Sequence, residues 1–178
     1  NILVIVNPKS GPGNSEAYWK NGIQILLKYT KLFDYKVVIT QKQYHGTEIC
    51  EQLNPSTYDY IVVLGGDGTA SEVYNGLNQN NNKNALNIPV LCLPTGSGNA
   101  MATELKAENT KNFLLDAIRN IIYGYSVYID AYAAKQKNQT DTLGFISTQW
   151  GVMAVIDFES EKFRFMGNFR FEFKGVLE

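Results

Sequence analysis

The sequence predicts an α/β protein built on a parallel sheet, and three observations predict it. Four short apolar runs alternate with helical patterns along the first 125 residues. Three of these runs lead directly into glycine-containing loops. After about residue 126 the alternation stops, and strand-like patterns follow one another with no helix-length pattern between them. We therefore expect a parallel-sheet domain over residues 1–125 and the start of an antiparallel β domain over residues 126–178.

The apolar runs of the first domain have the length and composition of buried parallel strands. They lie at residues 2–6, 35–40, 60–64 and 90–93. Helical patterns separate and follow them, at residues 15–29, 46–53, 70–77, 99–105 and 110–123. Because the strands are parallel, their carboxyl ends should meet along one edge of the sheet.

The second domain is expected to consist of strands. Strand patterns lie at residues 128–134, 143–157 and 169–173, and the last of them alternates phenylalanine with charged residues. The polar tract 135–141 is predicted to be a hairpin connection, and the asparagine-rich tract 78–84 a surface excursion without function. Three strands would leave an unpaired edge, so we expect the rest of this domain to lie beyond Glu178.

The composition narrows the function classes. The chain has 178 residues, 44% of them hydrophobic, which is enough to bury a core. A formal charge of -1 excludes binding of nucleic acid by bulk electrostatics. Cys50 and Cys92 have neither disulfide nor metal-ligand spacing, which favours a reducing compartment. No apolar run has the length of a membrane span, and the first residue is Asn1, so we expect an excerpt of a longer protein.

Three glycine loops follow predicted strands. They are Asn7–Asn14 after the first strand, Gly65–Thr69 after the third and Gly96–Asn99 after the fourth. Glycines let the backbone turn sharply and approach a ligand closely, and the helix that follows offers N–H groups to phosphate. One such loop is more often a turn, but three at one sheet edge indicate a ligand crevice there.

Asp67 lies inside the second of these loops. A carboxylate among amides that cradle phosphate would repel the ligand, unless it binds the metal counter-ion or accepts a proton from an attacking nucleophile. A plain helix cap in a tight turn explains this loop equally well when the loop is taken alone. That alternative loses ground once the other two glycine loops are counted.

The order and spacing of these loops resemble the diacylglycerol kinase catalytic-domain superfamily, and within it the sphingosine kinases. The segment Gly96-Ser97-Gly98-Asn99-Ala100 is similar to the sphingosine-kinase form of its loop, and residues 150–170 are similar to the entry into the lipid domain. The resemblance covers nearly the whole chain. It implies a nucleotide-binding α/β domain followed by an antiparallel β sandwich that holds the lipid, with ATP in the cleft between them.

The resemblance also implies roles for individual residues. Asp67 is similar to the general base that takes a proton from the primary hydroxyl of a sphingoid base as this oxygen attacks the γ-phosphate of ATP bound with Mg²⁺. Asp157 resembles the carboxylate that meets the lipid ammonium, and Ser147 lies where the family has a serine near the head group. The implied nucleotide-binding residues are Asn7, Pro8, Ser10, Gly11, Gly13, Asn14, Thr40, His45, Gly65, Gly66, Gly68, Thr69, Gly96, Ser97, Gly98, Asn99, Arg164 and Arg170.

Elementary chemistry supports this set and leaves alternatives for its charged members. Phosphoryl transfer needs positioning and charge neutralisation, which loops, Mg²⁺, two arginines and one carboxylate supply. Asp157 lies in an apolar run, so it is expected to need a cationic partner or access to solvent. From the residues alone, a local arginine such as Arg164 ranks above a lipid amine as that partner. Arg164 and Arg170 fit solvated strand-face charges equally well. His45 is a nucleotide neighbour or a cap, and Pro12 removes one N–H donor from the first loop.

The function expected from these observations is phosphorylation of a sphingoid base by ATP and Mg²⁺. Because the substrate partitions into bilayers, we expect a cytoplasmic protein in reversible contact with membranes. The chain alone is expected to be inactive, since residues beyond 178 should complete both sites. The alternatives are a diacylglycerol or ceramide kinase, whose neutral substrate does not need Asp157, and a non-catalytic module that binds nucleotide or lipid. NAD kinases share the Gly-Gly-Asp-Gly-Thr loop but lack the Gly-Ser-Gly-Asn-Ala loop.

Overall fold

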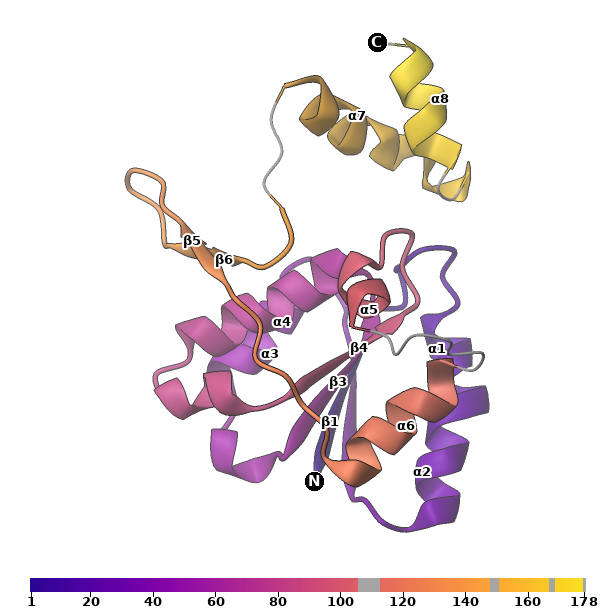
Figure 1. The fold of residues 1–178 in the computed structure, drawn as a ribbon, viewed down its shortest axis with the longest axis vertical. Helices are drawn as coiled ribbons and strands as arrows, with labels where there is room; N and C mark the ends of the chain where they lie inside the picture. The colour runs from indigo at the N-terminus through magenta and orange to yellow at the C-terminus, as the bar shows by residue number, and fades with distance from the viewer. Residues whose placement is uncertain (106–112, 148–150, 167–168, 178) are drawn as a thin grey trace.

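The computed structural model describes residues 1–105, 113–147, 151–166 and 169–177. In this part of the chain a four-stranded parallel sheet has the order β2-β1-β3-β4 (Figure 1). Its strands are β1 (Ile2–Val6), β2 (Tyr35–Ile39), β3 (Tyr60–Gly65) and β4 (Val90–Pro94). All four predicted strands are confirmed to within one residue at each end. In the register of the sheet, Ile2 lies opposite both Tyr35 and Tyr60, and Ile61 lies opposite Val90.

One face of the sheet is covered by the first helices and by the last helix of the domain (Figure 1). These are α1 (Ser15–Tyr18), the π-helical turn η1 (Trp19–Ile23), α2 (Gln24–Thr30) and α6 (Phe113–Tyr123). Trp19, Leu27 and Ile121 pack against Val4 and Val62 of the sheet. The helix predicted over residues 15–29 is therefore confirmed, with a π turn in its middle.

The other face is covered by α3 (His45–Gln52) and α4 (Asp67–Gln79). Cys50, Val73 and Leu77 from these helices are buried against the sheet. The two helices approach each other closely at Gly76, where a Cβ would overlap the carbonyl oxygen of Thr47. Only glycine permits this close contact.

Short helices connect the remaining elements. They are the 3₁₀ helices η2 (Pro55–Thr57) and η3 (Lys83–Asn87) and the helix α5 (Ala100–Glu104). The tract 78–84 is only partly the surface excursion that we predicted. Asn80 in this tract is 3% exposed, and its amide donates to the carbonyl oxygens of Cys50 and Leu53 at 2.9 Å each. This asparagine holds the end of α4 against the end of α3.

The start of an antiparallel region is confirmed only for one hairpin. Strands β5 (Tyr132–Ala134) and β6 (Thr142–Gly144) pair antiparallel, and residues 135–141 connect them as predicted. The strand expected over 143–157 is confirmed only for Leu143 and Gly144, and from residue 152 on it is wrong, as is the strand expected over 169–173. The described residues from 152 on form α7 (Val152–Ser160), the 3₁₀ helix η4 (Glu161–Met166) and α8 (Phe169–Leu177).

The physical reason for this error differs between the two helices. The apolar run that begins α7 has no alternation, and such a run does not distinguish a strand from a buried helix. In α8 the apparent alternation also satisfies helical spacing, because residues four apart share one face of a helix. Arg170 and Lys174 are 5% and 8% exposed, whereas Phe169 and Phe173 are on the exposed side. In Figure 1, α7 and α8 pack together, apart from the sheet. No helix in the described ranges is long and apolar enough to cross a bilayer.

Candidate nucleotide site

The carboxyl edge of the sheet brings together the three predicted glycine loops. We define them as the first loop (residues 7–14), the second loop (residues 65–69) and the third loop (residues 95–99). A Cβ on Gly96 would overlap the Cα of Gly66, and a Cβ on Gly66 would lie 2.8 Å from the carbonyl oxygen of Gly98. Gly11 has φ +53°, and a Cβ there would lie 2.7 Å from the carbonyl oxygen of Thr95. These glycines are therefore needed where loop touches loop.

Gly68 differs from these glycines. A Cβ at Gly68 would meet no atom within 4 Å, so the space beside it is open. The sequence-based reason for the glycines, close approach of a ligand, applies best at this position. Gly68 is also the second residue of α4, where backbone N–H groups have no partner within the helix.

Side chains of the first loop and of α1 fasten the loops to one another. The Nδ2 of Asn7 donates to the Oγ1 of Thr69 at 2.9 Å, and its Oδ1 accepts the N–H of Lys9 at 3.0 Å. The hydroxyl of Ser15 donates to the Oγ1 of Thr95 at 2.8 Å, and both residues are buried. Sequence reasoning missed Ser15 and Thr95, since no local pattern relates two residues that are 80 positions apart.

The third loop is also closed on itself. The side-chain oxygen of Asn99 accepts the N–H of Gly96 at 2.9 Å, and its Nδ2 donates to the carbonyl oxygen of Gly96 at 2.7 Å. Inside this loop the hydroxyl of Ser97 is buried and has no hydrogen-bond partner among the described residues. Buried polar atoms nearly always have a partner, so this hydroxyl fits a ligand that supplies one.

Asp67 begins α4 and caps a different helix. Its Oδ2 accepts the N–H of Ala100 at 2.9 Å and its Oδ1 accepts the N–H of Met101 at 3.0 Å. The helix cap that we weighed against a chemical role is therefore present, but at α5 rather than at α4. Each carboxylate oxygen has a second lone pair, which leaves capacity to accept a proton. Burial, and secondarily the charge of Asp67, raises the pKa of the Cys92 thiol to about 12.

Thr40 and His45 lie at the same sheet edge, after β2. Thr40 is buried, and its N–H donates to the carbonyl oxygen of Val6 at 2.8 Å. The Nδ1 of His45 accepts the N–H of Gln41 at 3.1 Å, so this ring closes the turn before α3. This bond is not a helix cap, because Gln41 lies before α3.

Glu72 is a second capping carboxylate that sequence reasoning missed. Its Oε1 accepts the N–H of Tyr44 at 3.1 Å and its Oε2 accepts the N–H of Gly46 at 3.0 Å. Glu72 lies on α4 and caps α3, just as Asp67 lies on α4 and caps α5. The partners are 26 and 28 positions away, which no local capping signature covers.

The residues predicted for the lipid head group, and the two arginines predicted for the ATP phosphates, lie after the β5–β6 hairpin. Among the described residues, no hydrogen bond joins Asp157 or Ser147 to the glycine loops. Asp157 lies on α7 with an exposed side chain, not in a buried strand as predicted, so an unpaired carboxylate there has no burial cost. Ser147 is exposed at the end of the segment after β6. Arg170 is buried on α8, which contradicts a solvated strand-face charge. The side chain of Arg164 lies outside the described part of the chain, and so does its pairing with Asp157.

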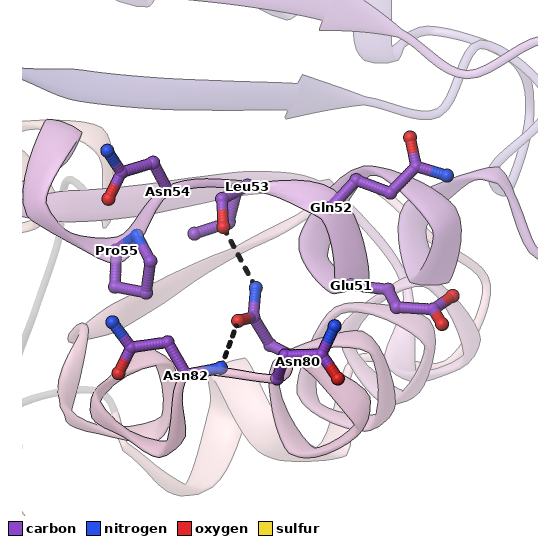
Figure 2. A pocket seen from close by; sticks show the side chains of 8 residues that line it. Glu51, Gln52, Leu53, Asn54, Pro55, Asn80 and Asn82 are labelled. Carbon is purple, nitrogen blue, oxygen red and sulfur yellow. Dashed lines mark hydrogen bonds between the residues drawn. The ribbon is translucent and has the colours of Figure 1, made fainter.

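A pocket of about 520 Å³ lies at the carboxyl-terminal ends of α3 and α4, away from the glycine loops (Figure 2). Its lining consists of Glu51, Gln52, Leu53, Asn54, Pro55, Asn80, Asn81 and Asn82. Figure 2 shows the side chain of Asn80 bonded to Leu53 and to the N–H of Asn82. The whole length of α4, about 18 Å at 1.5 Å per residue, separates this pocket from Asp67. It is not part of the glycine-loop site.

Comparison with known proteins gives consistent matches. The diacylglycerol kinase catalytic domain matches residues 1–133. Sphingosine kinase 1 of Arabidopsis thaliana is 33% identical over 177 residues, which are 98% of this chain and 36% of that protein. Sphingosine kinase 2 of Homo sapiens is 30% identical over 183 residues, which cover 99% of this chain and 28% of that protein.

A solved structure agrees with these relatives. A putative diacylglycerol kinase from Bacillus anthracis superposes with a TM-score of 0.57 and 27% sequence identity, over 74% of this chain and 44% of that chain. The chain spans about a third of the length of the two curated relatives named above.

Proposed function

Since the chain belongs to the diacylglycerol kinase catalytic domain family, we propose that it carries the nucleotide-binding and base-supplying part of an ATP-dependent lipid kinase. The observation that carries the proposal is the assembly of three cross-linked glycine loops around Asp67 at one sheet edge. Glycine loops beside a helix N-terminus suit the phosphates of ATP, and a carboxylate among them suits removal of a proton from a hydroxyl. The proposed unit is residues 1–125, and residues 126–178 begin the lipid-binding part.

The residues of the three loops are proposed to hold ATP. The open space at Gly68 and the unsatisfied hydroxyl of Ser97 are the features of this structure that fit a phosphate ligand. No group of three or more His, Cys, Asp or Glu in the described residues could hold a metal ion. Mg²⁺ in kinases binds through one or two carboxylates together with substrate phosphates. Mg²⁺ bound with ATP would supply neutralisation of phosphate charge, and no residue of the chain is assigned to hold it.

We assign to Asp67 the role of general base. When the lipid hydroxyl attacks the γ-phosphate, its proton passes to a carboxylate oxygen of Asp67. The N–H groups of Ala100 and Met101 already bind one lone pair on each oxygen, which fixes the plane of the carboxylate before substrate arrives. Such preorganisation removes a cost that a freely rotating side chain would pay during the reaction.

The proposed lipid is a sphingoid base such as sphingosine. The support is that relatives matching almost the whole chain are named sphingosine kinases. Asp157 is exposed on α7 and available to an ammonium group, with Ser147 as a second candidate near the head group. Arg164 and Arg170 remain candidates for phosphate binding. A lipid of this kind resides in bilayers, so the proposal includes reversible contact of a cytoplasmic protein with a membrane surface.

Phosphorylation of diacylglycerol is the second candidate. The observation that favours it is the structural match to a protein described as a putative diacylglycerol kinase. Diacylglycerol has no ammonium group, so this activity does not need Asp157.

A radiolabelled ATP assay on the full-length protein tests both candidates, with sphingosine, diacylglycerol and ceramide offered side by side. We expect label in sphingosine, no label after Asp67→Asn, and a large loss with sphingosine after Asp157→Asn. If label appears in diacylglycerol and persists after Asp157→Asn, diacylglycerol is the substrate instead of sphingosine, and Asp67 is still the proposed base. Nucleotide binding without label in any lipid would refute the kinase proposal.

A further inference from the structure

The β5–β6 hairpin is attached to α4 through one asparagine. Asn75 lies on α4 and is 7% exposed. Its Oδ1 accepts the N–H of Leu143 at 2.8 Å, and its Nδ2 donates to the carbonyl oxygen of Leu143 at 3.0 Å. The same Nδ2 also donates to the carbonyl oxygen of Ser71 at 2.9 Å. One side-chain amide thus pairs both backbone polar groups of one residue in β6.

This arrangement imitates a neighbouring strand. Leu143 lies opposite Ala133 in the hairpin register, and its own N–H and carbonyl oxygen go to Asn75. An edge strand without a neighbour leaves such groups unpaired. The carboxamide of Asn75 presents an N–H donor and a carbonyl acceptor in one plane, as a peptide group does, so it satisfies this position of the edge, and its second N–H is free to bond Ser71.

A second contact lies beside this one. The rings of Tyr74 and Phe145 have centroids 4.9 Å apart and planes inclined by 56°. Burial is the main cause that raises the pKa of the Tyr74 hydroxyl above its usual range. Figure 1 shows the hairpin beside α4, in agreement with these contacts.

The attachment lies between two parts of the proposed reaction. Asn75 follows Asp67 by eight residues on the same helix, a rise of about 12 Å. On the other side, Leu143 precedes the head-group candidate Ser147 by four residues. A rigid helix therefore joins the base to the segment that leads into the lipid-side residues.

We infer that Asn75 is a positioning residue for lipid phosphorylation, which fixes the hairpin on α4 and so holds the lipid-side segment at a set distance from Asp67. This inference rests on the proposed function. It assigns Asn75 to the lipid substrate and not to ATP, because the glycine loops are fastened to one another by bonds that do not involve the hairpin.

Two substitutions at Asn75 test the inference in the full-length protein. Asn75→Leu keeps the volume of the side chain and leaves both groups of Leu143 without the amide. Asn75→Asp keeps an acceptor for the N–H of Leu143 but turns an oxygen toward the carbonyls of Leu143 and Ser71. For both variants we expect kcat/KM for sphingosine to fall about 10- to 100-fold, since small misplacements far from the chemistry cost this much. The KM for ATP should stay near the wild-type value.

Asn80→Leu is the matched control. Asn80 is also a buried asparagine that bonds two backbone carbonyls, but it joins α4 to the end of α3 and does not contact the hairpin. Both leucine variants should lower the melting temperature, but only Asn75→Leu should lower kcat/KM for sphingosine while the KM for ATP stays unchanged. Phe145→Ala removes the second contact from the hairpin side, and it should affect these two kinetic constants in the same way as Asn75→Leu.

Hydrogen exchange supplies a readout that does not need turnover. The amide hydrogen of Leu143 should exchange faster in Asn75→Leu than in the wild type. In Asn80→Leu its exchange rate should be unchanged. If the wild type is active, this inference alone is refuted when Asn75→Leu changes the kinetic constants for lipid and for ATP equally, or when it leaves hydrogen exchange at Leu143 unchanged. A wild type that binds nucleotide but phosphorylates no lipid refutes the proposed function, and the inference with it.

Discussion

Substitution of Asp67 by asparagine separates its two roles, because the structure lets the capping cost be worked out. Asparagine keeps one oxygen and turns the other into an NH₂ group that faces the N–H of Ala100 or Met101. One charge-assisted bond is then lost at a half-exposed site. Loss of a helix cap costs about 0.5–2 kcal/mol, and we take about 1–2 kcal/mol for the free energy of unfolding. A domain of ordinary stability survives this loss and stays folded at 25 °C.

The expected effect on the reaction is much larger. Removal of a general base lowers kcat by about 10²- to 10⁴-fold, whereas a capping loss by itself leaves the folded population almost unchanged. The assay measures kcat of the full-length protein at saturating ATP and sphingosine, together with the melting temperature of each variant. Asp67→Asn should lose kcat far beyond any fraction that is unfolded.

Glu72→Gln is the control for this substitution. Glu72 also accepts two hydrogen bonds from backbone N–H groups, at 3.0 and 3.1 Å, but it caps α3 and lies outside the proposed reaction. The two variants should lose similar stability, and Glu72→Gln should keep a kcat near the wild-type value. A similar loss of kcat in both variants, or full activity in Asp67→Asn, would show that Asp67 is a cap and not the base.

Four further predictions concern stability and reactivity. In a double-mutant cycle with Ser15→Ala and Thr95→Val, chemical unfolding should give a coupling of about 1 kcal/mol, because their hydroxyls bond each other in a buried site. Gly76→Ala should lower the free energy of unfolding by about 1–3 kcal/mol through overlap with α3, whereas Gly68→Ala, with open space around it, should leave it nearly unchanged. Burial raises the pKa of both cysteine thiols to about 12, so they should resist alkylation in the folded protein at pH 8 and react after denaturation. With the folded pKa above the unfolded value, stability should fall as the pH rises from about 9 toward 12, as urea titrations at increasing pH would measure.

The sequence was sufficient to predict the sheet and the helices of the first domain. The inner strands β1 and β3 are buried on both faces, and the edge strands β2 and β4 are partly buried, so all four are largely apolar runs between turn residues. The helices show one apolar stripe. The three glycine loops were placed correctly for the same reason, since each directly follows one of these strands. The prediction of strands after residue 150 was wrong because an unbroken apolar run and an aromatic alternation are each compatible with a helix.

The contacts that assemble the site were not predictable from local patterns. Ser15 bonds a residue 80 positions away, and Asn75 bonds a residue 68 positions away. Capping signatures relate residues three positions apart, so they do not identify a carboxylate on one helix that caps another. Asp67 was found only because its glycine neighbours drew attention to it, and Glu72, which has no such neighbours, was missed.

The spacing of polar residues on α4 explains why this helix determines so much of the arrangement. Val73 and Leu77 are four positions apart and face the sheet, as the helical pattern predicts. Glu72 and Gly76, also four apart, face α3. The remaining face carries Asp67 and, eight positions later, Asn75, which bind α5 and β6.

An amphipathic helix is normally interpreted as one apolar face toward the core and one polar face toward water. On α4 the polar residues Asp67, Glu72 and Asn75 are bonded to the backbones of other elements, so their polarity serves assembly and not solvation. Among the polar positions of α4, Asn75 is where a change should alter the distance between the proposed base and the segment that follows β6 without disturbing the hydrophobic core.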